Sequence, residues 1–107
     1  MQDYEIRAIG KVNSSLNMNE RLSEGAMGLC GEAGEVTDLI KKYLYQGHEL
    51  KLTELCEELG DVLWYIIDIA STVGISFETI QQENIKKLDK RYPNGFSSER
   101  SINRSKK

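Results

Sequence analysis

Residues 52–73 are the segment that most constrains the fold of this chain. Their apolar side chains recur with the period of an α-helix and cover roughly 200° of a helical wheel, about twice the width that a surface helix needs. One narrow stripe interrupts them and consists of Glu54, Glu58, Asp61, Tyr65 and Asp68. We therefore expect a helix that other elements cover on two sides, with its acidic stripe facing a cleft or another helix.

Two carboxylate pairs at helical spacing lie within apolar stretches of the chain. Glu32 and Glu35 share one helix face, and Glu58 and Asp61 share a face of another helix. If the two faces meet, like charges about 4 Å apart repel by roughly 4 kcal/mol at an effective dielectric near 20, so the cluster needs protons or cations. Oxygen ligands favour Mg²⁺ or Mn²⁺. The alternative interpretation is that both pairs lie on solvated faces of amphipathic helices.

Glycines recur at every third position around the first pair, at Gly25, Gly28, Gly31 and Gly34. Each costs a helix about 1 kcal/mol relative to alanine, so a benefit elsewhere is expected. Gly28 and Gly31 lie near the face of the first carboxylate pair. Their missing side chains either leave room for a ligand or allow a neighbouring helix to approach closely, and the sequence leaves both interpretations open.

The remaining pattern predicts an all-α protein with a four-helix-bundle-like fold. The chain has a single proline, Pro93, and no run in which apolar and polar residues alternate as in a strand. Residues 1–96 are expected to form one helical domain, and residues 97–107 a polar, disordered tail. The expected helices span approximately residues 3–12, 19–46, 52–73 and 77–91.

Charge and composition narrow the class of protein. A net charge of −3 argues against a binder of nucleic-acid polymers, because phosphate contacts need a basic surface. No segment approaches the roughly 20 apolar residues of a membrane span, so no membrane partner is expected. The first residues are acidic where a signal peptide would be basic, which favours a cytoplasmic protein. Cys30 and Cys56 occupy apolar helical positions and are expected to be buried thiols.

The last predicted helix carries an amide and two cations on one face, at Asn84, Lys87 and Arg91. A metal held by carboxylates, with basic groups opposite, suits a phosphate chain, because the metal and the cations bind different phosphoryl oxygens. The pattern therefore favours phosphoanhydride chemistry. For each residue alone, a solvated helix face is the alternative.

Three motifs in order resemble the MazG-type nucleotide pyrophosphohydrolases. They are Gly31-Glu32-Ala33-Gly34-Glu35, then Glu57-Glu58-Leu59-Gly60-Asp61-Val62-Leu63-Trp64-Tyr65, then Asn84-x-x-Lys87-Leu88-x-x-Arg91-Tyr92-Pro93 with Gly95-Phe96. The resemblance spans about residues 22–96, which is most of the chain. No single motif is specific, but the ordered set is.

This resemblance implies an all-α NTP pyrophosphohydrolase fold and hydrolysis of a nucleoside triphosphate to the monophosphate and pyrophosphate. It implies Mg²⁺ as cofactor, with Mn²⁺ as a substitute, and assembly as a homodimer or homotetramer. Asn84 and Lys87 match positions that contact the phosphate or sugar end of the nucleotide. One carboxylate of the cluster would orient or deprotonate the attacking water. The metal ligands implied are Glu32, Glu35, Glu58 and Asp61.

Other functions remain open at this stage. The dUTPase-like branch of the same superfamily cleaves the same bond with a uracil-specific pocket. A non-catalytic helical module for oligomerisation or partner binding would also use the wide apolar face of residues 62–73, with Trp64 as an anchor. A carboxylate-bridged di-iron or di-manganese bundle is disfavoured, because His48 is the single histidine and falls in no Glu-x-x-His pair.

Overall fold

The computed structural model describes residues 2–104 and is helical throughout that range, apart from turns and an isolated bridge between Pro93 and Gly95. The all-α prediction is therefore confirmed. The first helix ends at Ile9 rather than Val12, and the other three long helices follow the expected ranges closely. The elements are α1 (Asp3–Ile9), α2 (Met18–Tyr45), α3 (Leu52–Thr72), α4 (Phe77–Arg91) and α5 (Ser98–Ile102).

Local sequence signals set both ends of α2. At its start Asn17 and Glu20 form a capping box, in which each side chain accepts a hydrogen bond of 2.9 Å from the backbone N–H of the other residue. At its end Gly47 adopts a positive φ of 72°, which lets the His48 N–H donate to the Lys42 carbonyl at 3.1 Å. The chain then reverses into α3.

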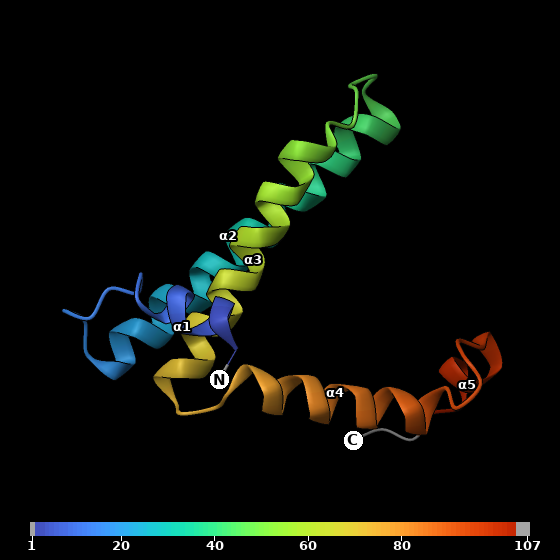
Figure 1. Cartoon of the computed structure of the whole chain (residues 1–107). Helices are drawn as coiled ribbons and strands as arrows, with labels where there is room; N and C mark the ends of the chain where they lie inside the picture. Colours follow the sequence, from blue (N-terminus) through green and yellow to red (C-terminus); the bar gives the residue numbers. More distant parts are fainter. Residues whose placement is uncertain (1, 105–107) are drawn as a thin grey trace.

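Helices α2 and α3 form a long antiparallel hairpin (Figure 1). Two glycines of α2 allow the close approach. A Cβ at Gly25 would lie 2.7 Å from Cγ1 of Ile69, and a Cβ at Gly28 would overlap the Tyr65 ring. At Gly31, by contrast, a Cβ would meet nothing within 4 Å. Close packing therefore explains the first two glycines, whereas the space beside Gly31 is open.

The buried core lies at the end of the hairpin away from its tip, where α1 packs on α3. Ala8, Ile67 and Ala70 are its buried apolar residues. The Trp64 indole N–H donates to the Ala8 carbonyl at 3.0 Å, which fixes α1 in place. Trp64 therefore anchors an element of its own chain.

A short turn between α3 and α4 changes the direction of the chain by 106°. Gly74 has a φ of 78°, and the Ile75 N–H donates to the Ala70 carbonyl at 2.9 Å, which ends α3. The Phe77 N–H, in the first turn of α4, donates to Oε2 of Glu5 at 2.8 Å. Glu5 is only 3% exposed. A buried carboxylate on α1 thus fixes the start of α4.

Helix α4 and the short α5 form an arm that leaves the hairpin and does not close a four-helix bundle within the single chain (Figure 1). No residue of α4 is buried. The accessible surface is 8069 Å², against about 6,000 Å² for a compact chain of this mass. The Cα radius of gyration is 16.8 Å, against about 13 Å for a compact domain of this length. The single chain therefore leaves much of its apolar surface uncovered.

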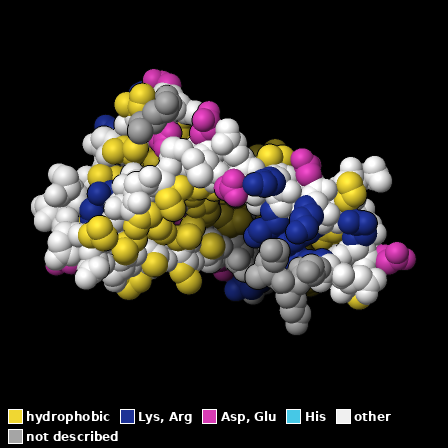
Figure 2. Space-filling model, turned by 90° about the horizontal axis from the view of Figure 1, so that it is seen from below, with side chains coloured by type: hydrophobic (Ala, Val, Ile, Leu, Met, Phe, Trp, Pro, Cys, Tyr) yellow, Lys and Arg dark blue, Asp and Glu magenta, His cyan; other side chains and the backbone are white. Residues whose placement is uncertain are grey.

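The expectation that Cys30 and Cys56 are buried is wrong for the single chain, in which both are exposed. Leu59, on the apolar arc of α3, is 50% exposed, so this arc is covered along only part of its width. Figure 2 shows apolar side chains spread over a broad area, and Lys and Arg side chains gathered on the arm. The helical periodicity indicated the apolar arc of α3, but residues 2–104 cover only part of it.

The tail expected to be disordered instead contains α5. The Ser97 hydroxyl accepts from the Arg100 N–H at 3.2 Å and so caps this helix, while the Arg100 side chain donates to carbonyls at the end of α4. Residues 105–107 of the expected tail lie outside the described residues. Within residues 2–104 no single helix is long and apolar enough to cross a membrane, and α3 and α4 reach that length and composition only as a bent pair.

Candidate functional site

The structure brings three of the four predicted carboxylates together at the middle of the hairpin. Glu32 comes from α2, and Glu58 and Asp61 come from α3. One oxygen of each lies within 4.8 Å of an oxygen of the others. The helical spacing of Glu58 and Asp61 puts both on the face that meets α2.

The electrostatics of this cluster show mutual repulsion. The neighbouring Glu32 carboxyl, within hydrogen-bonding reach, raises the pKa of Glu58 above its ordinary value, and partial desolvation and the charges of Asp61 and Glu57 add to the shift. Oε2 of Glu58 is buried and has no hydrogen-bond partner among the described residues. A buried carboxylate oxygen without a partner is costly, so this atom needs a proton or a cation.

Tyr65 lies beside the same cluster, although nothing in the sequence beyond its place on the acidic stripe indicated a role for it. Its ring packs on Gly28, and its edge meets Trp64 with ring centroids 4.9 Å apart. Burial, followed by the charges of Glu32 and other carboxylates, raises the pKa of the Tyr65 phenol. The phenol therefore stays protonated beside the cluster and can donate a hydrogen bond.

The donor set suits a hard divalent cation. Carboxylate oxygens are the ligands that Mg²⁺ and Mn²⁺ take, and no soft ligand is among the three converging groups. The unpartnered oxygen of Glu58 is the atom that such an ion would satisfy. The residues present therefore fit the cation that the sequence predicted.

Glu35, the fourth predicted carboxylate, is exposed and is not part of the converging group. It lies one helical turn nearer the hairpin tip than Glu32. Further along α2, Lys42 pairs with Asp38 at 2.8 Å. The Asp38 carboxylate raises the pKa of Lys42, and Glu35 and Glu54 add smaller effects. A role for Glu35 stays a prediction. Lys42 is engaged in its own helix rather than directed at the cluster.

Asp68, the last acid of the stripe, serves the fold instead. It is 2% exposed and pairs with Arg21 at 3.0 Å, and Arg21 also donates to the Ser71 hydroxyl at 3.2 Å. This network ties the beginning of α2 to the end of α3. The sequence pattern could not show whether Asp68 forms an ion pair or binds a metal, because its partner Arg21 is distant in the chain.

Asn84 and Lys87, the predicted substrate-binding residues, lie on exposed positions of α4. With a rise of 1.5 Å per residue along each helix and a direction change of 106° between them, Lys87 lies about 20 Å from Asp61 within the same chain. The single chain therefore does not bring these residues to the carboxylates. Their role stays a prediction.

Comparison with known proteins assigns the chain to a family. The family model described as the MazG nucleotide pyrophosphohydrolase domain matches residues 22–96, a range that contains all of the predicted site residues. The chain belongs to this family. A MazG domain is thus built on α2, α3 and α4, with its three converging carboxylates on the hairpin.

One relative extends the comparison. This MazG protein is 39% identical over 80 residues to the Gene 37 protein of Mycobacterium phage L5, and the match covers 71% of this chain and 70% of the relative. No solved structure matches the chain. Because the relative's name describes no activity, the functional argument depends on the family and on the geometry of the carboxylates.

Proposed function

We propose that this chain is a Mg²⁺-dependent nucleoside triphosphate pyrophosphohydrolase, which converts a triphosphate and water to the monophosphate and pyrophosphate. The observation that carries the proposal is the convergence of Glu32, Glu58 and Asp61 within 4.8 Å in a MazG domain. The raised pKa of Glu58 and its unpartnered oxygen support the proposal. A bound cation would offset the repulsion between the carboxylates and would give this oxygen a partner.

Each residue has a role in this proposal. Glu32, Glu58 and Asp61 hold the metal, and Mn²⁺ can replace Mg²⁺ there. When bound, the metal neutralises charge on phosphoryl oxygens. Glu35, one turn along α2 and outside the converging group, is free to orient the attacking water and accept its proton. The Tyr65 phenol donates a hydrogen bond at the edge of the site.

The active form is proposed to be a homodimer or homotetramer. The chain exposes about 2,000 Å² more surface than a compact chain of its mass, which is the scale of a stable protein interface. Met27 and Leu59, at the flanks of the hairpin, are 68% and 50% exposed. A second copy would cover such residues. It could also bring Asn84 and Lys87 to the carboxylates of its neighbour, which they do not reach within one chain.

The test is product analysis with a panel of canonical and modified nucleoside triphosphates, including dUTP, in Mg²⁺ and in EDTA. Metal-dependent formation of pyrophosphate, lost in Glu58→Gln, would support the proposal. The matched control is Glu57→Gln, which removes the adjacent carboxylate of α3 that lies outside the converging group. Release confined to dUTP would assign the chain to the dUTPase-like branch. A folded oligomer that cleaves no nucleotide would favour the binding-module interpretation.

A further inference from the structure

The turn between α3 and α4 does not by itself fix the direction of the arm. The Ile75 N–H donates to the Ala70 carbonyl at 2.9 Å, which ends α3. The Ser76 hydroxyl accepts from the Thr79 N–H at 3.1 Å, which caps α4. Each bond serves the end of one helix, and neither joins the two helices. Because no residue of α4 is buried, packing does not set its direction either.

Two hydrogen bonds from the N-terminal segment hold α4 instead. Oε2 of the buried Glu5 accepts from the Phe77 N–H at 2.8 Å, and the side-chain amide of Gln2 donates to Oε1 of Gln81 at 2.7 Å. Phe77 and Gln81 are one helical turn apart, so the two bonds hold one face of α4 at two points. Two points define the direction of the helix. The side-chain contact of Gln81 also defines the rotation of α4 about its axis.

Helix α1, which carries Glu5, is itself fixed beside the carboxylate site. The Trp64 indole N–H donates to the carbonyl of the buried Ala8 at 3.0 Å. Trp64 precedes Tyr65 in the sequence, and Asp61 lies one turn before Tyr65 on the same face of α3. Helix α1 therefore connects the helix that carries two of the converging carboxylates with the arm.

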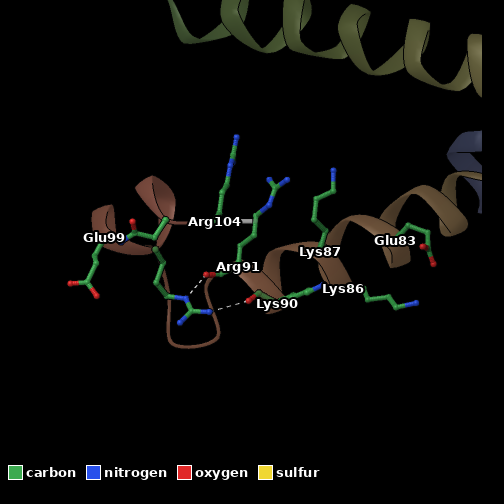
Figure 3. A pocket seen from close by; sticks show the side chains of 9 residues that line it. Glu83, Lys86, Lys87, Lys90, Arg91, Glu99 and Arg104 are labelled. Atoms are coloured by element: carbon green, nitrogen blue, oxygen red, sulfur yellow. Dashed lines mark hydrogen bonds between the residues drawn. The ribbon is translucent and has the colours of Figure 1, made fainter. Parts of the chain in front are cut away.

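The direction and rotation of α4 decide where Lys87 lies. Figure 3 shows Lys87 pointing to the side of α4 on which the ribbon of the hairpin is drawn, whereas Lys86 and Lys90 point in other directions. Lys87 lies about 15 Å beyond Phe77 along the axis of α4, so a change of about 10° at the start of the helix displaces it by roughly 3 Å. Such a displacement breaks a hydrogen bond, because the length of these bonds varies by only about 0.5 Å.

We propose that Glu5 is a positioning residue for the triphosphate site. Together with Gln2 it orients α4 so that Asn84 and Lys87 reach the phosphate chain of the substrate. This role rests on the proposed function, in which those two residues bind the nucleotide. Glu5 acts through α4, because it is not one of the converging carboxylates. The whole of α1 lies outside the residues 22–96 that the family model matches, so this device belongs to the chain rather than to the MazG motif.

Steady-state kinetics of the full chain with Mg²⁺ and a triphosphate substrate test this role. Glu5→Ala/Gln2→Ala should raise KM at least about tenfold, because contacts to charged phosphates are lost, while Mn²⁺ affinity stays unchanged. A merely structural loss would lower kcat through a smaller folded fraction and leave KM unchanged. Glu5→Gln, which keeps an acceptor oxygen for the Phe77 N–H, should restore KM. The matched control Asp3→Ala removes an exposed carboxylate of the same helix and should not alter KM.

A distance measurement tests the orientation of α4 without any need for turnover. Spin labels are placed at Thr53→Cys on α3 and Asp89→Cys on α4, both exposed, in a background from which the two native cysteines have been removed. Excess unlabelled chain isolates the distance within one chain. The distribution of distances should broaden or shift in Glu5→Ala/Gln2→Ala. Gln2→Ala, at an exposed position, should show the same change in smaller degree, and it serves if Glu5→Ala does not fold.

The outcomes separate this role from the proposed function. An unaltered distance distribution in Glu5→Ala/Gln2→Ala would overturn the role of Glu5, because other contacts would then hold α4. Turnover with an unchanged KM in this variant would overturn the role of Glu5 alone. Absence of turnover in the unaltered chain would refute the proposed function and this role together.

Discussion

Replacing Gly28 with alanine tests how closely α2 and α3 pack at the candidate site. A Cβ at this position would overlap the Tyr65 ring, whereas a Cβ at Gly31, one turn along the same helix, would meet nothing within 4 Å. The two positions share backbone conformation and helix propensity, so they form a matched pair. Their difference reports the contact with Tyr65.

The expected magnitudes follow from two opposing effects. Glycine to alanine within a helix gains up to about 1 kcal/mol from propensity, and overpacking a helix contact costs about 1–3 kcal/mol. We therefore expect Gly31→Ala to stabilise the protein by about 0.5–1 kcal/mol. Gly28→Ala should be less stable than Gly31→Ala by about 1–3 kcal/mol, which corresponds to a Tm lower by at least about 4 °C.

Thermal unfolding of both variants, in metal-free buffer and at equal concentration, measures the difference. In a Tyr65→Ala background the penalty of Gly28→Ala should disappear, because the ring that the new Cβ meets is gone. An equal or higher Tm for Gly28→Ala than for Gly31→Ala would refute the packing argument. A destabilising Gly31→Ala would show that another surface, such as a second copy, fills the space beside it.

Three further predictions concern buried or clustered carboxylates. Because Glu32 raises the pKa of Glu58, the metal-free folded protein binds this proton more tightly than the unfolded chain, so stability falls as the pH rises from the ordinary value of 4.5 through the raised pKa. Glu58→Gln should flatten this part of a profile of urea unfolding against pH, and an unchanged slope would contradict the assigned cause. Asp68→Asn, which weakens the buried pair with Arg21, should lower the free energy of unfolding by about 3 kcal/mol while leaving Mn²⁺ affinity unchanged; the reverse pattern would make Asp68 a ligand. Glu5→Ala removes the acceptor at the start of α4 and should lower the free energy of unfolding by about 1–3 kcal/mol. Backbone hydrogen exchange in the first turn of α4 should become faster, and an unaltered exchange rate would contradict this role of Glu5.

Some parts of the site could be predicted because they depend on local spacing. Residues three apart share a helix face, so the convergence of Glu58 and Asp61 towards a second helix was predictable once the apolar pattern had defined α3. The ends of α3 and α4 also depend on local signals. Gly74 ends α3, and the Ser76 hydroxyl caps α4 by accepting from the Thr79 N–H at 3.1 Å, so both act on neighbouring backbone groups.

Other parts depend on distant residues, and the sequence could not show them. The direction of α4 is fixed by Glu5 accepting from Phe77, and the burial of Asp68 is explained by Arg21. Neither partner is near in the chain. The exposure of Cys30 arises in the same way, because helical periodicity identifies an apolar face without saying whether the same chain covers it.

The central claim is that Glu32, Glu58 and Asp61 form a metal site, and Mn²⁺ binding followed by electron paramagnetic resonance tests it most directly. The account predicts saturable binding that is lost in Glu58→Gln, kept in the control Glu57→Gln, and displaced by Mg²⁺. Equal Mn²⁺ binding by Glu58→Gln and the unaltered protein would contradict the account, because the ion would then be held elsewhere.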